Sequence, residues 1–178
     1  LVILQKYKIV FGGTMGAGKT EAIKTFSEIP VLATEAYNTD DQAHSKTFTT
    51  VGIDYGEIKL DEETVVGLYG TPGQDRFDFI WSVICKGAIG AVVLIDHSNP
   101  KALEDLEFYL SSFQQYLSNI VIAITHVDEN SNYLLKNYRA WLEQKQFKHP
   151  LFAIDARVKD DVLLLVETLI AKAEVEYT

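Results

Sequence analysis

Eight consecutive residues near the amino end combine three glycines with a lysine and a threonine. They are Gly13, Thr14, Met15, Gly16, Ala17, Gly18, Lys19 and Thr20. The glycines allow a tight loop whose N–H groups point at one phosphate, and a helix that begins here adds the positive end of its dipole. Lys19 would reach the β- and γ-phosphates, and the Thr20 hydroxyl would bind Mg²⁺. The pattern predicts a nucleoside triphosphate site; a glycine-rich turn without a ligand is the alternative.

ATPases, kinases and GTPases share this loop, so the residues that distinguish them must lie downstream. Four segments follow it, each at the start or end of an expected strand. They are residues 50–54 (Thr-Val-Gly-Ile-Asp), 70–77 (Gly-Thr-Pro-Gly-Gln-Asp-Arg-Phe), 125–128 (Thr-His-Val-Asp) and 155–157 (Asp-Ala-Arg). In their order and spacing these segments resemble those of the small GTPase superfamily, which includes the Ras, Rab and Arf families. The resemblance runs from Lys6 to about Ala173.

The resemblance implies a role for several residues around the γ-phosphate. Thr50 would bind Mg²⁺ together with Thr20, Gly73 would donate its N–H to the γ-phosphate, and Gln74 would orient the attacking water. The implied catalytic set is therefore Lys19, Thr50 and Gln74. Phosphoryl transfer depends on positioning and charge neutralisation more than on covalent chemistry, and a neutral amide can accept from water while it donates to a phosphate oxygen. An ordinary turn before a helix is the alternative for Gly73 and Gln74.

The resemblance also implies a guanine site. Asp128 would accept from guanine N1–H and the 2-amino group, two donors that adenine lacks. Thr125 and His126 stand where the family has Asn and Lys, and His126 would pack on the base and ribose. Residues 155–157 stand where the family has Ser-Ala-Lys, which implies that the Ala156 N–H meets guanine O6 between Asp155 and Arg157. Asp128 as the N-cap of the next helix is the alternative.

Three positions depart from the family pattern. Gly70 replaces an aspartate that holds Mg²⁺ through water, which should weaken metal binding; Asp54 or Asp96 could compensate, although both also suit caps or solvated positions. Met15 is bulky where Ras has glycine and Arf has aspartate, so it should crowd an incoming arginine finger. Arg76, two residues after Gln74, is an alternative finger supplied by the chain itself.

The elements that must position these residues are a mostly parallel sheet and its covering helices. The expected strands are 6–11, 49–60, 64–69, 91–95, 120–124 and 151–154, and the expected helices are 19–29, 75–86, 100–116, 132–144 and 159–174. Residues 31–48 are polar and are expected to form a long surface loop. Apolar strands alternating with helices predict an α/β P-loop fold with six strands, one of them an antiparallel edge strand, and helices on both faces. A single GTP-binding domain over residues 1–178 is expected.

Composition limits the class of partner. The chain has 16 basic and 25 acidic side chains and a formal net charge of −9. A general nucleic-acid binder needs a basic face, so none is expected as a partner. The one cysteine excludes an intrachain disulfide. Neither a membrane-spanning run, a signal peptide nor a prenylation box is evident, so we expect a cytoplasmic protein without evident membrane association.

Three functions are consistent with these patterns. The first is a GTP/GDP switch that hydrolyses GTP slowly, uses Mg²⁺ as cofactor and meets effectors or regulators at residues 50–54 and 70–77. The second is a nucleotide-binding interaction module that does not hydrolyse, and the third is a P-loop ATPase or small-molecule kinase. The Gly-Thr-Pro-Gly-Gln form is similar to that of prokaryotic MglA-like small GTPases, which implies a roadblock-domain protein as a partner.

Overall fold

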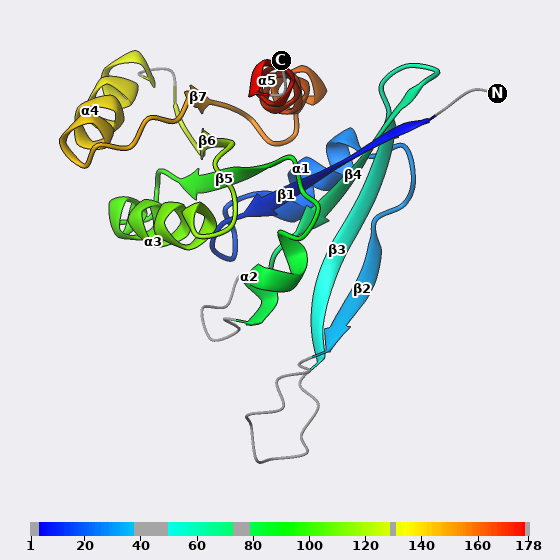
Figure 1. The fold of residues 1–178 in the computed structure, drawn as a ribbon. Helices are drawn as coiled ribbons and strands as arrows, with labels where there is room; N and C mark the ends of the chain where they lie inside the picture. Colours follow the sequence, from blue (N-terminus) through cyan, green and yellow to red (C-terminus); the bar gives the residue numbers. More distant parts are fainter. Residues whose placement is uncertain (1–3, 38–49, 73–78, 129–130, 177–178) are drawn as a thin grey trace, which may run out of the picture.

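The computed structural model describes residues 4–37, 50–72, 79–128 and 131–176 of the chain. These residues form one sheet of seven strands in the order β2-β3-β4-β1-β5-β6-β7, which runs across Figure 1 from β2 to β7. The strands are β1 (Gln5–Gly12), β2 (Leu32–Tyr37), β3 (Thr50–Lys59), β4 (Thr64–Gly70), β5 (Gly90–Asp96), β6 (Ile120–Thr125) and β7 (Leu151–Ala153). The predicted α/β fold class is confirmed, with one more strand than the sequence indicated.

The additional strand is β2, which lies within the segment expected to be a polar loop. It pairs antiparallel with β3, which pairs antiparallel with β4, while β4, β1, β5, β6 and β7 pair parallel to one another. The antiparallel strand is therefore β3, and it lies inside the sheet, whereas β2 forms the edge. Leu32 in β2 is half exposed, as is common on an edge strand, so the segment lacks an apolar pattern that would reveal it.

Five helices among the described residues cover the two faces of the sheet. They are α1 (Lys19–Phe26), α2 (Phe79–Ile84), α3 (Ala102–Gln114), α4 (Ser131–Gln144) and α5 (Lys159–Glu176). One buried cluster joins α1 and α5 to one face, and a second joins α2, α3 and α4 to the other. In α5 one side faces the sheet, because Val162, Leu165, Val166 and Leu169 are fully buried.

Helix α1 ends three residues earlier than expected. The sequence predicted a helix over 19–29, up to the residue before Pro30, but the helix ends at Phe26 because Ser27 adopts an extended backbone. The Ser27 hydroxyl accepts from the Glu57 N–H at 2.9 Å and donates to the Ile29 carbonyl at 2.8 Å. These bonds tie the end of α1 to β3, and so fix the start of α1 over the sheet.

The chain passes from one side of β1 to the other after β4, which makes the carboxyl end of β1 a topological switch point. Ligands bind at such points in open α/β sheets. The loop after β1, the end of β4 and the ends of β5, β6 and β7 all lie along this edge. No helix in the described ranges is long and apolar enough to cross a membrane.

Candidate functional site

The glycine-rich loop joins β1 to α1 in a conformation that favours glycine, above all at the two positions where the backbone is also closely packed. Gly13 and Gly18 have φ values of +150° and +107°, which side-chain-bearing residues rarely adopt. A Cβ on Gly13 would lie 2.4 Å from the Leu94 carbonyl oxygen of β5. The loop is therefore pressed against the neighbouring strand. Gly18 also caps α1 without a side-chain hydrogen bond, which suits a helix start that receives an anion.

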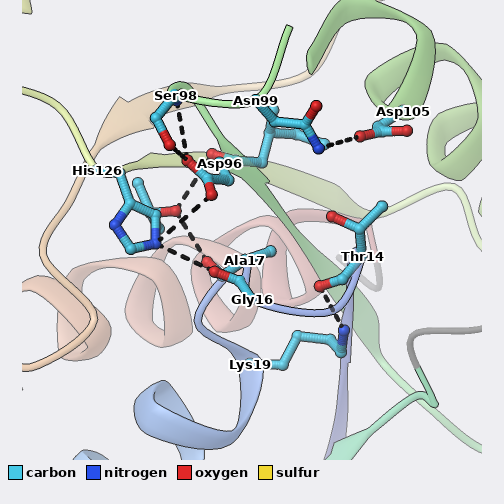
Figure 2. Close-up of polar contacts among 11 residues, drawn as sticks. Thr14, Gly16, Ala17, Lys19, Asp96, Ser98, Asn99, Asp105 and His126 are labelled. Carbon is cyan, nitrogen blue, oxygen red and sulfur yellow. Dashed lines mark hydrogen bonds and ion pairs between the residues drawn. The ribbon is translucent and has the colours of Figure 1, made fainter. Parts of the chain in front are cut away.

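Lys19 is buried inside this loop. The residue is 9% exposed, and its Nζ donates to the carbonyl oxygens of Gly13 and Thr14, the latter at 2.9 Å. Figure 2 shows the contact with Thr14. Burial lowers the pKa of Lys19 to about 8, and the nearby Asp54 carboxylate opposes that fall. Lys19 is thus a cation at neutral pH. Among the described residues its hydrogen-bond acceptors are backbone carbonyls, which it can exchange for an anion.

Thr20 follows directly and contacts a carboxylate from β3. Its hydroxyl donates to Asp54 Oδ2 at 2.8 Å. Hydroxyl and carboxylate oxygens are the hard donors that Mg²⁺ prefers, so the pair fits the ion that the sequence predicted at Thr20. Asp54, offered from the sequence as one of two substitutes for the aspartate missing at Gly70, is the one that contacts the loop.

The middle of the loop is held by the end of β6 and the residue that follows it. Thr125 is 2% exposed, and its hydroxyl donates to the Ala17 carbonyl at 2.8 Å. His126 has a φ of +58° and places its Nε2 3.1 Å from the Gly16 carbonyl oxygen and 3.9 Å from Asp96 Oδ2, as Figure 2 shows. Since the carbonyl only accepts, Nε2 carries the proton in that bond. Both residues therefore position the loop.

Residues 155–157 form a compact turn after β7. The Arg157 guanidinium donates twice to Asp155, from Nε at 3.0 Å and from its terminal nitrogen at 2.8 Å. These bonds and the Arg157 backbone N–H hold the pKa of Asp155 down, to about 2. Ala156 between them is 8% exposed and lies against Gly18 of the loop. The turn is thus rigid and packed on the start of α1.

These parts surround one cavity of about 790 Å³. Its lining includes the loop from Met15 to Thr20, the strand-end residues Gly52, Asp54, Gly70, Thr71 and Pro72, and residues 125–127 and 154–157. Met15 is 76% exposed, so its side chain stands at the rim and leaves the cavity open. A volume of this size is in the range of small-molecule and cofactor sites.

Several predicted residues lie elsewhere or outside the described part of the chain. Gly73, Gln74 and Arg76 fall outside the described residues. Thr50 begins β3 opposite Tyr37, but its side chain is not described. Asp128 is exposed and follows Val127, which lines the cavity; Asp128 itself is not among the lining residues.

One residue at the site was not singled out from the sequence. Thr71 is 4% exposed, and its N–H and hydroxyl both donate to the Phe11 carbonyl, at 2.9 and 3.2 Å. It fixes the segment after β4 to the carboxyl end of β1, beside the loop. A threonine in a glycine- and proline-containing stretch carries no sequence signal for this role, because its partner lies 60 residues away in the chain.

The sheet order, the loop after β1 and the cavity define a G-domain-like fold of the P-loop superfamily. Over residues 11–170 the chain matches the model of the family described as "Conserved hypothetical ATP binding protein", and it belongs to that family. It is also similar in structure to the G domain of the T. maritima FeoB iron transporter, with a TM-score of 0.66 over 95% of this chain and 99% of that one. At 16% identity that likeness shows the fold.

Curated relatives include small Ras-related proteins. The chain is 30% identical over 115 residues to Ras-related protein Rab-8A of Gallus gallus, covering 63% of this chain and 50% of that protein. It is 29% identical over 119 residues to Ras-related protein Rab-8B of Homo sapiens, covering 65% and 51%. The matches thus span about half the length of these relatives.

Proposed function

We propose that this chain binds guanine nucleotides and works as a GTP/GDP switch that hydrolyses GTP slowly. The observation that carries the proposal is the buried Lys19 ammonium at the head of a 790 Å³ cavity. Within the described part of the chain, its hydrogen-bond acceptors are the carbonyl oxygens of Gly13 and Thr14. A triphosphate oxygen is a stronger partner for an ammonium than a neutral carbonyl, because both members of the new hydrogen bond are charged.

At the phosphate end the chain supplies donors and a metal ligand. The backbone N–H groups at the start of α1 bind the phosphates, and the Lys19 ammonium balances their charge. Mg²⁺, when bound, would neutralise the negative charge that develops on the phosphates during transfer. The Thr20 hydroxyl would hold the ion, and Thr50 is the further hydroxyl ligand expected from the sequence.

At the base end we propose guanine rather than adenine. A carboxylate at Asp128 accepts two hydrogen bonds from guanine N1–H and the 2-amino group, whereas adenine N1 would face it with a lone pair. A site left with an unpaired polar group rejects the wrong base strongly. The Ras-related relatives favour this proposal, while the family description names ATP. Adenine binding is therefore the competing function.

Titration of nucleotide-free protein with GDP and with ADP, each with and without Mg²⁺, distinguishes guanine binding from adenine binding. We expect GDP to bind ~10⁴-fold more tightly or better, the discrimination that a missing hydrogen-bond partner produces. Equal affinities would end the guanine proposal, and tighter ADP binding would support the function named by the family description.

An Asp128→Asn variant tests the base contact through a gain of binding. Xanthine carries a carbonyl oxygen where guanine has the 2-amino group, so an asparagine amide can donate where the aspartate accepted. We expect the variant to lose GDP affinity and to gain affinity for xanthosine diphosphate. A damaged loop cannot produce that gain, whereas a loss for both nucleotides would place Asp128 in a capping role.

The hydrolytic part of the proposal concerns Gln74, Gly73 and Thr50. Gln74 orients the attacking water, and the γ-phosphate holds Gly73 and Thr50 until hydrolysis releases them, which is the switch. We propose that protein partners bind at the two segments that hold these residues, 50–54 and 70–77. Single-turnover phosphate release should be slow in the parent and slower in Gln74→Leu. No turnover in the parent, even with tight GTP binding, would favour a non-hydrolysing interaction module.

A further inference from the structure

We propose that Asp54 of β3 supplies the carboxylate of the magnesium site, in place of the one that β4 would carry at Gly70. The proposal rests on the nucleotide-binding function above. P-loop proteins hold Mg²⁺ with the loop hydroxyl and a strand-end aspartate. Here the strand end next to the loop carries a glycine, and an acidic side chain of the adjacent strand, Asp54, contacts Thr20 of the loop.

The strand register places Asp54 where it can replace the carboxylate missing at Gly70. Asp54 is directly opposite Gly70 in the antiparallel pairing of β3 with β4, and residues so paired project to the same face of a sheet. A Cβ on Gly70 would lie 3.4 Å from the Asp54 Cβ and 2.9 Å from Ile23 Cδ1 of α1. Asp54 therefore stands on the α1 face, in the space that a side chain at position 70 would enter.

The hydrogen bond between Thr20 and Asp54 has the direction that a metal site needs. The Thr20 hydroxyl donates its one hydrogen to Asp54 Oδ2, which turns its oxygen lone pairs away from the carboxylate. Those lone pairs are then available to a cation in the cavity that both residues line. The carboxylate can in addition accept from a water on the ion, since Mg²⁺ keeps several of its waters.

Within the described ranges, three other carboxylates near the loop have different partners or positions. Both oxygens of Asp155 accept from Arg157. Asp96 accepts from the backbone N–H and hydroxyl of Ser98, at 2.9 and 2.6 Å, and lies beside His126 (Figure 2). Glu21 also lines the cavity, from the exposed outer side of α1. Asp54 is the one of these four with a hydrogen bond to Thr20.

The first test is the Mg²⁺ affinity of the GDP-loaded protein, measured by calorimetric titration in Asp54→Asn. The asparagine oxygen can still accept from Thr20, so the variant removes the charge and keeps the size. We expect a ~10- to 100-fold loss of Mg²⁺ affinity, the range found when groups that orient metal ligands are changed. GDP dissociation in excess EDTA should match that of the parent, because the phosphate loop itself is intact.

Two matched carboxylate variants make the result specific. Glu21→Gln removes an equal charge from the same cavity, and Asp96→Asn tests the other candidate; both should retain the parental Mg²⁺ affinity. Parental affinity in Asp54→Asn, or a larger loss in Asp96→Asn, would overturn the proposal while the nucleotide-binding function stands. A parent that binds no nucleotide would instead remove the function on which the proposal rests.

A relocation variant keeps the proposal testable if Asp54→Asn folds poorly. Asp54→Ala combined with Gly70→Asp moves the carboxylate to the neighbouring strand, and Ile23→Val makes room for it. We expect this triple variant to recover Mg²⁺ affinity at least tenfold over Asp54→Ala with Ile23→Val alone. Without any recovery, Asp54 would be a structural partner of Thr20 and the proposal would fail.

Discussion

The affinity for nucleotide should depend on pH through Lys19. In the free protein, burial lowers the pKa of this side chain to about 8, although the Asp54 carboxylate partly opposes the shift. A bound phosphate favours the charged form and raises the pKa again. Above pH 8 the protein must therefore take up a proton as it binds, and by linkage the affinity must fall as the pH rises.

The size of this effect follows from the two protonation states. With a pKa of about 8 when free and a much higher pKa when bound, the affinity at pH 9 should be about tenfold below that at pH 7, or ~1.4 kcal/mol. Calorimetric titration with GDP at both pH values measures it. A Lys19→Met variant should bind weakly at both and retain only the slope that comes from ionisation of the nucleotide.

Either of two results would show that Lys19 does not contact the phosphates as proposed. One is an affinity in the parent that is constant from pH 7 to pH 9. The other is a Lys19→Met variant with the full parental slope.

Two further predictions concern the support of the loop. Thr125→Val removes the hydroxyl bonded to Ala17 and leaves a buried carbonyl unpaired, so the free energy of unfolding in urea should fall by about 1–3 kcal/mol. Thr125→Ser keeps the hydroxyl and should lose less stability. Equal losses in the two variants would assign the effect to side-chain packing instead. Gly13→Ala places a methyl group 2.4 Å from the Leu94 carbonyl and should abolish GDP binding. Gly16→Ala meets nothing within 4 Å and should cost only the ~1–2 kcal/mol of a left-handed residue, so similar affinities in these two variants would contradict the packing described.

Much of the fold could be predicted because its signals are local. The apolar strands β5 and β6 and the glycine-rich loop can each be recognised from a few consecutive residues. The edge strand β2 does not, since Leu32 is half exposed and the pairing with β3 depends on residues that follow much later. The end of α1 was also misplaced, because the Ser27 hydroxyl binds Glu57 of β3 and so ends the helix before Pro30 is reached.

The same distinction between local and long-range signals applies to the site. The loop from Gly13 to Thr20 could be predicted from the sequence because its backbone geometry demands glycine at fixed spacing. The contact of Thr20 with Asp54 spans 34 residues and depends on the register of β3 against β4, so the sequence left Asp54 and Asp96 as equal candidates. The bond from His126 to Gly16 spans 110 residues. Such contacts follow from tertiary packing, which local patterns do not record.

A crystal structure with a non-hydrolysable GTP analogue and Mg²⁺ gives the most direct answer on nucleotide binding. We expect the Lys19 Nζ to leave the carbonyl oxygens of Gly13 and Thr14 for the β- and γ-phosphates, with the base between His126 and Ala156. A structure grown in excess analogue that keeps Lys19 on those two carbonyls, beside an empty cavity, would contradict the proposed function.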